Sequence, residues 1–163
     1  MPARILVAGI GNIFLGDDGF GSEVVRRLGD TLDGVRVTDY GIRGMHLAYD
    51  LLDGWDGLVL VDAIPDRGAP GHVVMFEADR DAAAGTPGLD AHSMNPDAVF
   101  ASLRALGGTV PRTIVVGCQV RDVADRIGLS TPVEAAVPNA LAAVADAVAL
   151  LRVPAEPLSR SKR

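Results

Sequence analysis

Short apolar runs alternate with amphipathic segments along most of the chain. Strands are predicted where aliphatic and β-branched residues follow one another, over 4–8, 35–38, 58–61, 72–76 and 113–119. Helices are predicted where apolar residues recur at helical spacing, over 19–28, 44–52, 96–106 and 131–151. This alternation predicts an α/β fold, with a mostly parallel sheet that is covered by helices on both faces.

Proline and acidic residues mark where two of these helices begin. Pro96 and Pro132 stand in the first turns of their helices, where proline is favoured. Glu134 follows Thr131 by three residues, which predicts a capping box at the start of the last helix. The segment 78–95 has no clear period, so we expect a long loop of the functional kind.

Composition narrows the class of protein. The chain has 163 residues, so we expect one domain over 1–155, with a short basic tail at 156–163 that is disordered. Aromatic residues make up 4% and the net charge is −6, which speaks against a nucleic-acid partner. We find no apolar stretch that approaches the ~20 residues of a membrane span, and no signal peptide, so we expect a cytoplasmic protein without a membrane partner. Cys118, the single cysteine, lies in an apolar strand and is interpreted as a buried side chain.

Acidic side chains follow three of the predicted strands. The first strand runs into a glycine-rich turn that ends in Asp17 and Asp18, Asp39 closes the second strand, and Asp62 closes the third. Because ligands of parallel sheets bind at the carboxyl ends of the strands, we expect these carboxylates to meet at one edge. Such a cluster favours either an acid–base pair or a cation site.

Nucleotide chemistry does not fit the turn after the first strand. Gly9 and Gly11 begin a dinucleotide-binding fingerprint, but Phe14 stands where its third glycine belongs, so we expect no nucleotide cofactor. Among the histidines, His46 and His72 are interpreted as structural or solvated. His92 lies in the long loop directly before a helix, and with two carboxylates it makes a ligand set that suits a divalent transition metal.

The chain resembles the hydrogenase maturation endopeptidases, which trim the C-terminal extension from the large subunit of nickel–iron hydrogenases. The matching pieces are 9–12 with 16–21, 39–44, 61–63, His92 and 128–130, in the family's order. The resemblance implies an α/β/α sandwich whose five-stranded twisted sheet has one antiparallel strand. It also implies that Asp18, Asp62 and His92 contact a metal, which is the nickel already inserted in the substrate and serves as a checkpoint for cleavage.

The resemblance leaves the hydrolytic step open between two mechanisms. A water bound to the metal can attack the peptide carbonyl, or a carboxylate such as Asp17 or Asp39 can act as general base. Asp17 can instead be a helix-end acid, and Asp39 can bind backbone amides of the turn 41–44. The glycines of the first turn are interpreted as clearance for the incoming peptide.

Two other functions and the oligomeric state complete the expectations. A non-catalytic metal-delivery or assembly chaperone for the same precursor is the alternative function, and a nucleotide-dependent enzyme is a weaker one. A cleft that must admit a large folded partner favours a monomer.

Overall fold

The structure is a computed structural model that describes residues 2–79 and 96–153. Its strands are β1 (Ile5–Ile10), β2 (Val35–Gly41), β3 (Gly57–Ile64), β4 (Val73–Glu77) and β5 (Arg112–Gln119). Its helices are the short 3₁₀ helix η1 (Gly16–Gly19), α1 (Phe20–Leu28), α2 (Gly44–Leu51), α3 (Pro96–Ala105) and α4 (Thr131–Arg152). Each predicted strand and helix is confirmed, with ends that shift by a few residues.

The five strands form one sheet in the order β2-β1-β3-β5-β4. β1, β2, β3 and β5 run parallel, and β4 pairs antiparallel with β5 at one edge. This arrangement confirms the predicted mostly parallel sheet with one antiparallel strand. β3 extends to Ile64 because it stays paired with β5 through Gln119. Asp62 therefore lies within the strand and not after its end.

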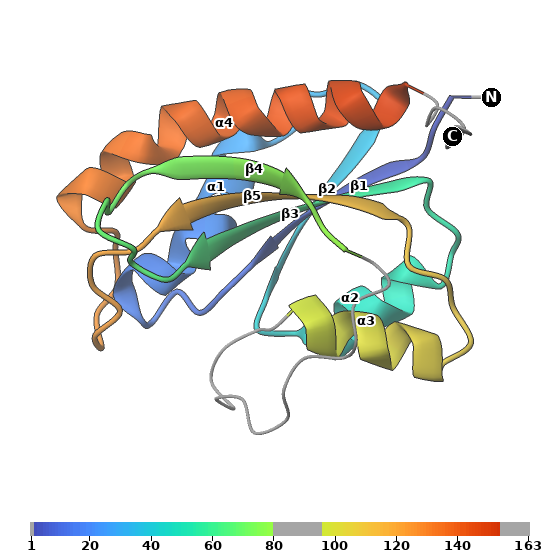
Figure 1. The fold of residues 1–163 in the computed structure, drawn as a ribbon, viewed down its shortest axis with the longest axis horizontal. Coiled ribbons are helices and arrows are strands. Elements are labelled where there is room, and N and C mark those ends of the chain that lie inside the picture. The colour runs from blue at the N-terminus through green and yellow to red at the C-terminus, as the bar shows by residue number, and fades with distance from the viewer. Residues whose placement is uncertain (1, 80–95, 154–163) are drawn as a thin grey trace, which may run out of the picture.

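Helices cover both faces of the sheet and make three layers (Figure 1). Successive strand residues point to opposite faces, so alternate positions enter separate cores. Val59 and Val61 pack with α1 and α4, whereas Leu58 and Leu60 pack with α2 and α3. Burial on both sides explains why the central strands are apolar throughout.

Helix α4 is the longest element and differs from the sequence prediction in two respects. Its 22 residues are long and apolar enough to cross a membrane by length and composition, although no such stretch was predicted. Eight of them are buried, most against the sheet, as in the core helix of a folded domain. The predicted capping box is wrong: the N-cap is Ser130, its hydroxyl does not cap the helix, and the Glu134 carboxylate pairs with Arg27.

Candidate active site

The four predicted acidic residues all lie toward the carboxyl ends of the parallel strands. Asp17 and Asp18 belong to η1 after β1, Asp39 lies near the end of β2, and Asp62 near the end of β3. β1 is the middle strand of these three, with Gly9 opposite both Asp39 and Val61. The sheet therefore brings the carboxylates to one edge, as expected, but their surroundings differ sharply.

Asp62 carries the most perturbed carboxyl group at this edge. Burial and, to a lesser extent, the negative charge of Asp18 raise the pKa of Asp62 to about 8, although the N–H of Ala63 opposes the shift. The charge of Asp18 thus acts on the Asp62 carboxyl group, and the two side chains repel each other when both are ionised. Such a pair holds one proton between two oxygen groups at neutral pH, or it holds a cation.

Asp18 is held in place by the loop that leaves β1. The N–H of Asn12 donates to Oδ2 of Asp18 at 2.8 Å. Gly11 lies so close that an added Cβ would be 2.0 Å from the Asp18 carbonyl oxygen, and its φ of 132° suits glycine. The carboxylate is therefore fixed by the backbone, and a residue larger than glycine at position 11 would displace it.

Asp17 is fully buried and has a different role from its neighbour. Its Oδ1 accepts from the N–H of Ser130 at 2.6 Å, and its Oδ2 accepts from the Ser130 hydroxyl at 2.7 Å and from the N–H groups of Arg121 and Asp122 at 2.8 and 3.0 Å. Burial by itself would raise the pKa of Asp17, but these hydrogen bonds outweigh it and hold the pKa below its usual value. This geometry favours a structural role that ties η1 to the loop 121–130 over a role as general base.

Ser130, Arg121 and Asp122 are partners that sequence reasoning did not assign to the site. The pairing joins residues more than one hundred positions apart, so no local pattern announces it. The one available signal was the resemblance itself, since 128–130 was among its matching pieces. A buried carboxylate such as that of Asp17 also demands donors from elsewhere in the fold.

Asp39 organises the turn after β2. Its Oδ1 accepts from the Ser22 hydroxyl at 2.7 Å and from the N–H of Gly41 at 3.0 Å. The Arg43 guanidinium donates to the carbonyl of Asp39 at 2.8 Å, and the Gly41 carbonyl accepts from the N–H of Gly11 at 2.9 Å. The expected contact between Asp39 and turn amides is thus present at Gly41, and the exposed side chain remains at the edge of the site.

The glycines of the first turn serve the fold more than they serve a ligand. A Cβ on Gly21 would lie 2.1 Å from the Val61 carbonyl oxygen, and one on Gly9 would lie 2.5 Å from the Gly21 carbonyl oxygen. Their clearance is filled by the chain's own backbone, where α1 packs directly on β1 and β3. The interpretation of these glycines as room for an incoming peptide is therefore wrong.

The histidines and the cysteine lie in different settings. His92 lies outside the described residues. Within 2–79 and 96–153, no group of three His, Cys, Asp or Glu side chains is placed to hold a metal ion. His46 pairs with Asp50 on α2 and His72 is exposed before β4, in line with their structural or solvated interpretation. Cys118 is buried as predicted, and burial raises the pKa of its thiol to about 11.

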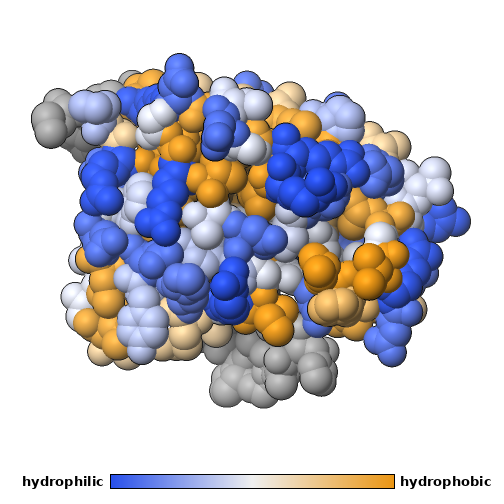
Figure 2. All heavy atoms as spheres, turned by 180° about the vertical axis from the view of Figure 1, so that it is seen from behind, coloured by the Kyte–Doolittle hydropathy of each residue, from blue (hydrophilic) through white to orange (hydrophobic). Residues whose placement is uncertain are grey.

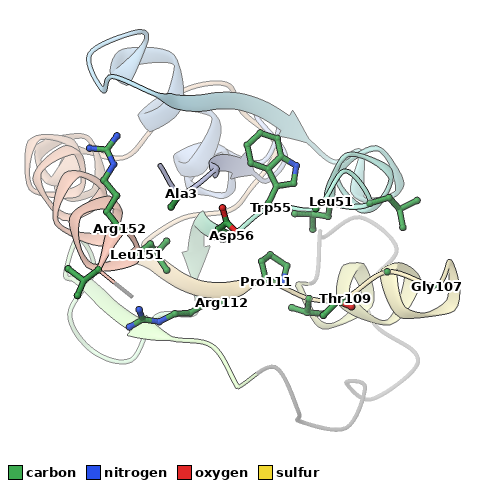
Figure 3. A pocket seen from close by; sticks show the side chains of 15 residues that line it. Ala3, Leu51, Trp55, Asp56, Gly107, Thr109, Pro111, Arg112, Leu151 and Arg152 are labelled. Carbon is green, nitrogen blue, oxygen red and sulfur yellow. The ribbon is translucent and has the colours of Figure 1, made fainter. Parts of the chain in front are cut away.

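A cavity in the described part of the chain lies at the opposite end of the sheet (Figure 3). It encloses about 810 Å³ between the amino ends of the strands, with Trp55, Asp56, Arg112 and Leu151 in its walls. The Asp56 carboxylate accepts from the backbone N–H of Arg4, and Arg112 is paired with Glu77, so both side chains already have partners. The cavity lacks the coupled acids of the other edge, and we do not assign chemistry to it.

Comparison with known proteins decides the family. The family model for hydrogenase maturation proteases matches residues 22–147 of this chain. The chain belongs to the hydrogenase maturation protease family. Hydrogenase 2 maturation protease of Escherichia coli K12 is 32% identical over 149 residues, which cover 89% of this chain and 90% of the relative.

Solved structures of maturation proteases share the fold. The hydrogenase maturating endopeptidase from E. coli superposes with a TM-score of 0.73 at 30% identity, covering 90% of this chain and 93% of that one. A hydrogenase 2 maturation peptidase from a Thaumarchaeota archaeon superposes at 0.68 and 29% identity, covering 90% and 99%. The chain is thus an enzyme of the peptidase class, and its α/β/α architecture is the architecture of these maturation proteases.

Proposed function

We propose that this maturation protease removes the C-terminal extension from the large-subunit precursor of a nickel–iron hydrogenase after nickel has been inserted. The observation that carries this proposal is the coupled pair of Asp18 and Asp62 at the carboxyl edge of the sheet. Two carboxylates that repel each other favour a cation between them. A metal that arrives with the substrate supplies that cation.

The donor set suits nickel in the precursor. Carboxylate oxygens from Asp18 and Asp62, joined by the imidazole of His92, would form the mixed oxygen and nitrogen set that divalent transition metals accept. The described residues supply the first two of these donors. A pair of carboxylates binds a metal weakly by itself, which is consistent with nickel as part of the substrate rather than a resident cofactor.

Before it binds a metal, Asp62 also suits proton transfer in peptide hydrolysis. The raised pKa of Asp62 lies near neutral pH, where a carboxyl group can both accept and release a proton. When nickel is bound it polarises water and carbonyl groups near it. Asp39, exposed beside the pair, is the remaining candidate base, and Asp17 supports the site from within the fold.

Direct cleavage of nickel-loaded precursor tests the proposal. Asp62→Ala and His92→Ala should lower the rate at least a hundredfold, measured as the intact mass of the large subunit before and after incubation. His72→Ala and Asp125→Ala are matched controls in exposed positions and should cleave at the wild-type rate. Wild-type rates for Asp62→Ala and His92→Ala would refute the assignment of these residues.

The same mass measurement separates proteolysis from the alternative role in assembly. A non-catalytic metal-delivery or assembly chaperone would bind the precursor and leave its C-terminal peptide attached. We propose that the protein acts as a monomer in the cytoplasm, where the precursor is synthesised. Its net charge of −6 gives no electrostatic attraction to nucleic acid or to an anionic membrane surface.

A further inference from the structure

Four large apolar side chains stand exposed around the Asp18 site. They are Ile13 at 47%, Phe14 at 61%, Ile42 at 62% and Ile127 at 74% exposure, and together we call them the apolar ridge. Their exposed area is on the order of 400 Å², which is half of what one partner contributes to a typical protein interface. In Figure 2, hydrophobic groups lie between hydrophilic ones at the right of the view, the side at which the parallel strands end, and others lie elsewhere on this face.

The ridge is continuous and borders two small hollows. A hollow of about 260 Å³ is lined by both Ile13 and Ile127. A second one of about 230 Å³ is lined by Ile13, Phe14 and Ile42, together with Asp39. Both volumes are smaller than the cavities that enclose drug-sized ligands, so the surface suits side chains of another protein better than a small molecule.

Hydrogen bonds join the two loops that carry most of the ridge. The N–H of Gly16 donates to the Arg126 carbonyl at 2.8 Å, and the N–H of Arg126 donates to the Phe14 carbonyl at 3.0 Å. The buried Asp17 carboxylate ties the same loops together from beneath. Ile13, Phe14 and Ile127 are therefore presented from a preorganised surface, which lowers the entropy lost on binding.

We infer that the apolar ridge is the docking surface for the folded body of the hydrogenase precursor, an inference that rests on the proposed function. The loop 12–16 that carries Phe14 also holds Asp18 through Asn12, so a protein whose metal reaches Asp18 comes to lie beside the ridge. A second copy of this chain on the ridge would close the site to substrate. The partner surface that fits is apolar, lies beside the precursor's metal centre, and is larger than the cleaved peptide.

The test compares binding with cleavage of nickel-loaded precursor. Phe14→Ser and Ile127→Ser should each raise the Kd for precursor and the KM at least tenfold, with kcat within about twofold of wild type. Phe14→Leu should restore the wild-type Kd. Leu150→Ser and Val153→Ser, at 46% and 60% exposure near the end of α4, are controls that should leave Kd and KM unchanged.

The outcomes separate the docking surface from the proposed function. A wild-type Kd and KM for both Phe14→Ser and Ile127→Ser would overturn the docking surface and leave the proteolytic function intact. Ridge-dependent binding of a precursor that is never cleaved would support the docking surface and refute the proposed function. A wild-type dimer in sedimentation that Ile127→Ser dissociates would overturn the inference, because the ridge would then be a self-association surface.

Discussion

Asp17→Asn removes the buried negative charge that ties η1 to the loop 121–130. The wild-type carboxylate accepts four hydrogen bonds, and one amide N–H, that of Ser130, points at Oδ1 from 2.6 Å. In the variant, the amide oxygen of the asparagine can take the place of Oδ2 and accept from the same three donors. The amide NH₂ group then faces the N–H of Ser130, and two donors oppose each other. Hydrogen bonds to charged groups contribute roughly 1.5–3 kcal/mol each, so we expect a loss of about 3 kcal/mol in the free energy of unfolding.

Thermal and urea unfolding at pH 7 measure this loss. In a chain of this size 1 kcal/mol shifts Tm by roughly 2–4 °C, so Tm should fall by roughly 6–12 °C. Asp125→Asn changes the same atoms on an exposed side chain of the same loop and should shift Tm by less than about 2 °C. Ser130→Ala keeps the backbone donor and loses only the hydroxyl, and should cost about 1 kcal/mol.

The pH dependence gives the sharper refutation. The pKa of Asp17 is lower in the folded protein than in the unfolded chain. The stabilisation that its carboxylate gives the fold is therefore complete at pH values above the unfolded pKa, and it is lost as the pH falls through the folded pKa. The difference in stability between wild type and Asp17→Asn should therefore be full at pH 7 and shrink in acid, below about pH 4. Equal Tm values at pH 7, or a difference that persists unchanged in acid, would refute the reasoning.

Three further predictions follow from the buried groups around the site. Asp62→Asn should stabilise the substrate-free protein by roughly 2–4 kcal/mol at pH 8 and by nothing near pH 4, because at pH 8 the folded wild type holds a proton on Asp62 that its unfolded chain releases. Equal pH profiles of the free energy of unfolding for the two proteins would contradict this. Gly21→Ala should lower the free energy of unfolding by at least about 3 kcal/mol, since the new Cβ would lie 2.1 Å from the Val61 carbonyl oxygen. Gly29→Ala places its Cβ within 4 Å of no atom and should cost about 1–2 kcal/mol for its positive φ; urea unfolding of the two variants compares these losses. Native Cys118 should resist iodoacetamide at pH 8, because its thiol is buried and its pKa is about 11; alkylation at the rate of the unfolded chain, followed by mass spectrometry, would contradict this.

The sequence was sufficient for the elements and for the edge at which the acids meet. Apolar runs such as 58–61 predict buried parallel strands directly, because both faces of such strands are covered. The ends were less certain, since pairing partners decide them. β3 continues to Ile64 through its register with β5, and this pairing carries Asp62 into the strand.

Contacts between distant parts of the chain account for what the sequence could not provide. The roles of Asp17 and Asp18 diverge because Ser130 and the amides of 121–122 reach only the first of them. The same contact overturns the expected capping box, since the Ser130 hydroxyl donates to Asp17 and leaves the helix end uncapped by that side chain. The hydrogen bonds of Asp17 to Ser130 and to the amides of 121–122 have no local sequence signature, because they form only when β5 and the loop after it are in place.

The hydrogen bonds between Asp17 and Ser130 also link a part of the chain that is made early to one that is made late. The two residues are 113 positions apart, and β5, which precedes Ser130, must insert between β3 and β4. Contacts of such sequence separation form late in folding. A nascent chain that has emerged only as far as β4 can pair β1, β2 and β3 and already contains Asp18 and Asp62, yet it lacks the donors that fix η1. The hydrogen bonds that fix η1 beside Asp18 are therefore complete only once the chain as far as Ser130 has folded.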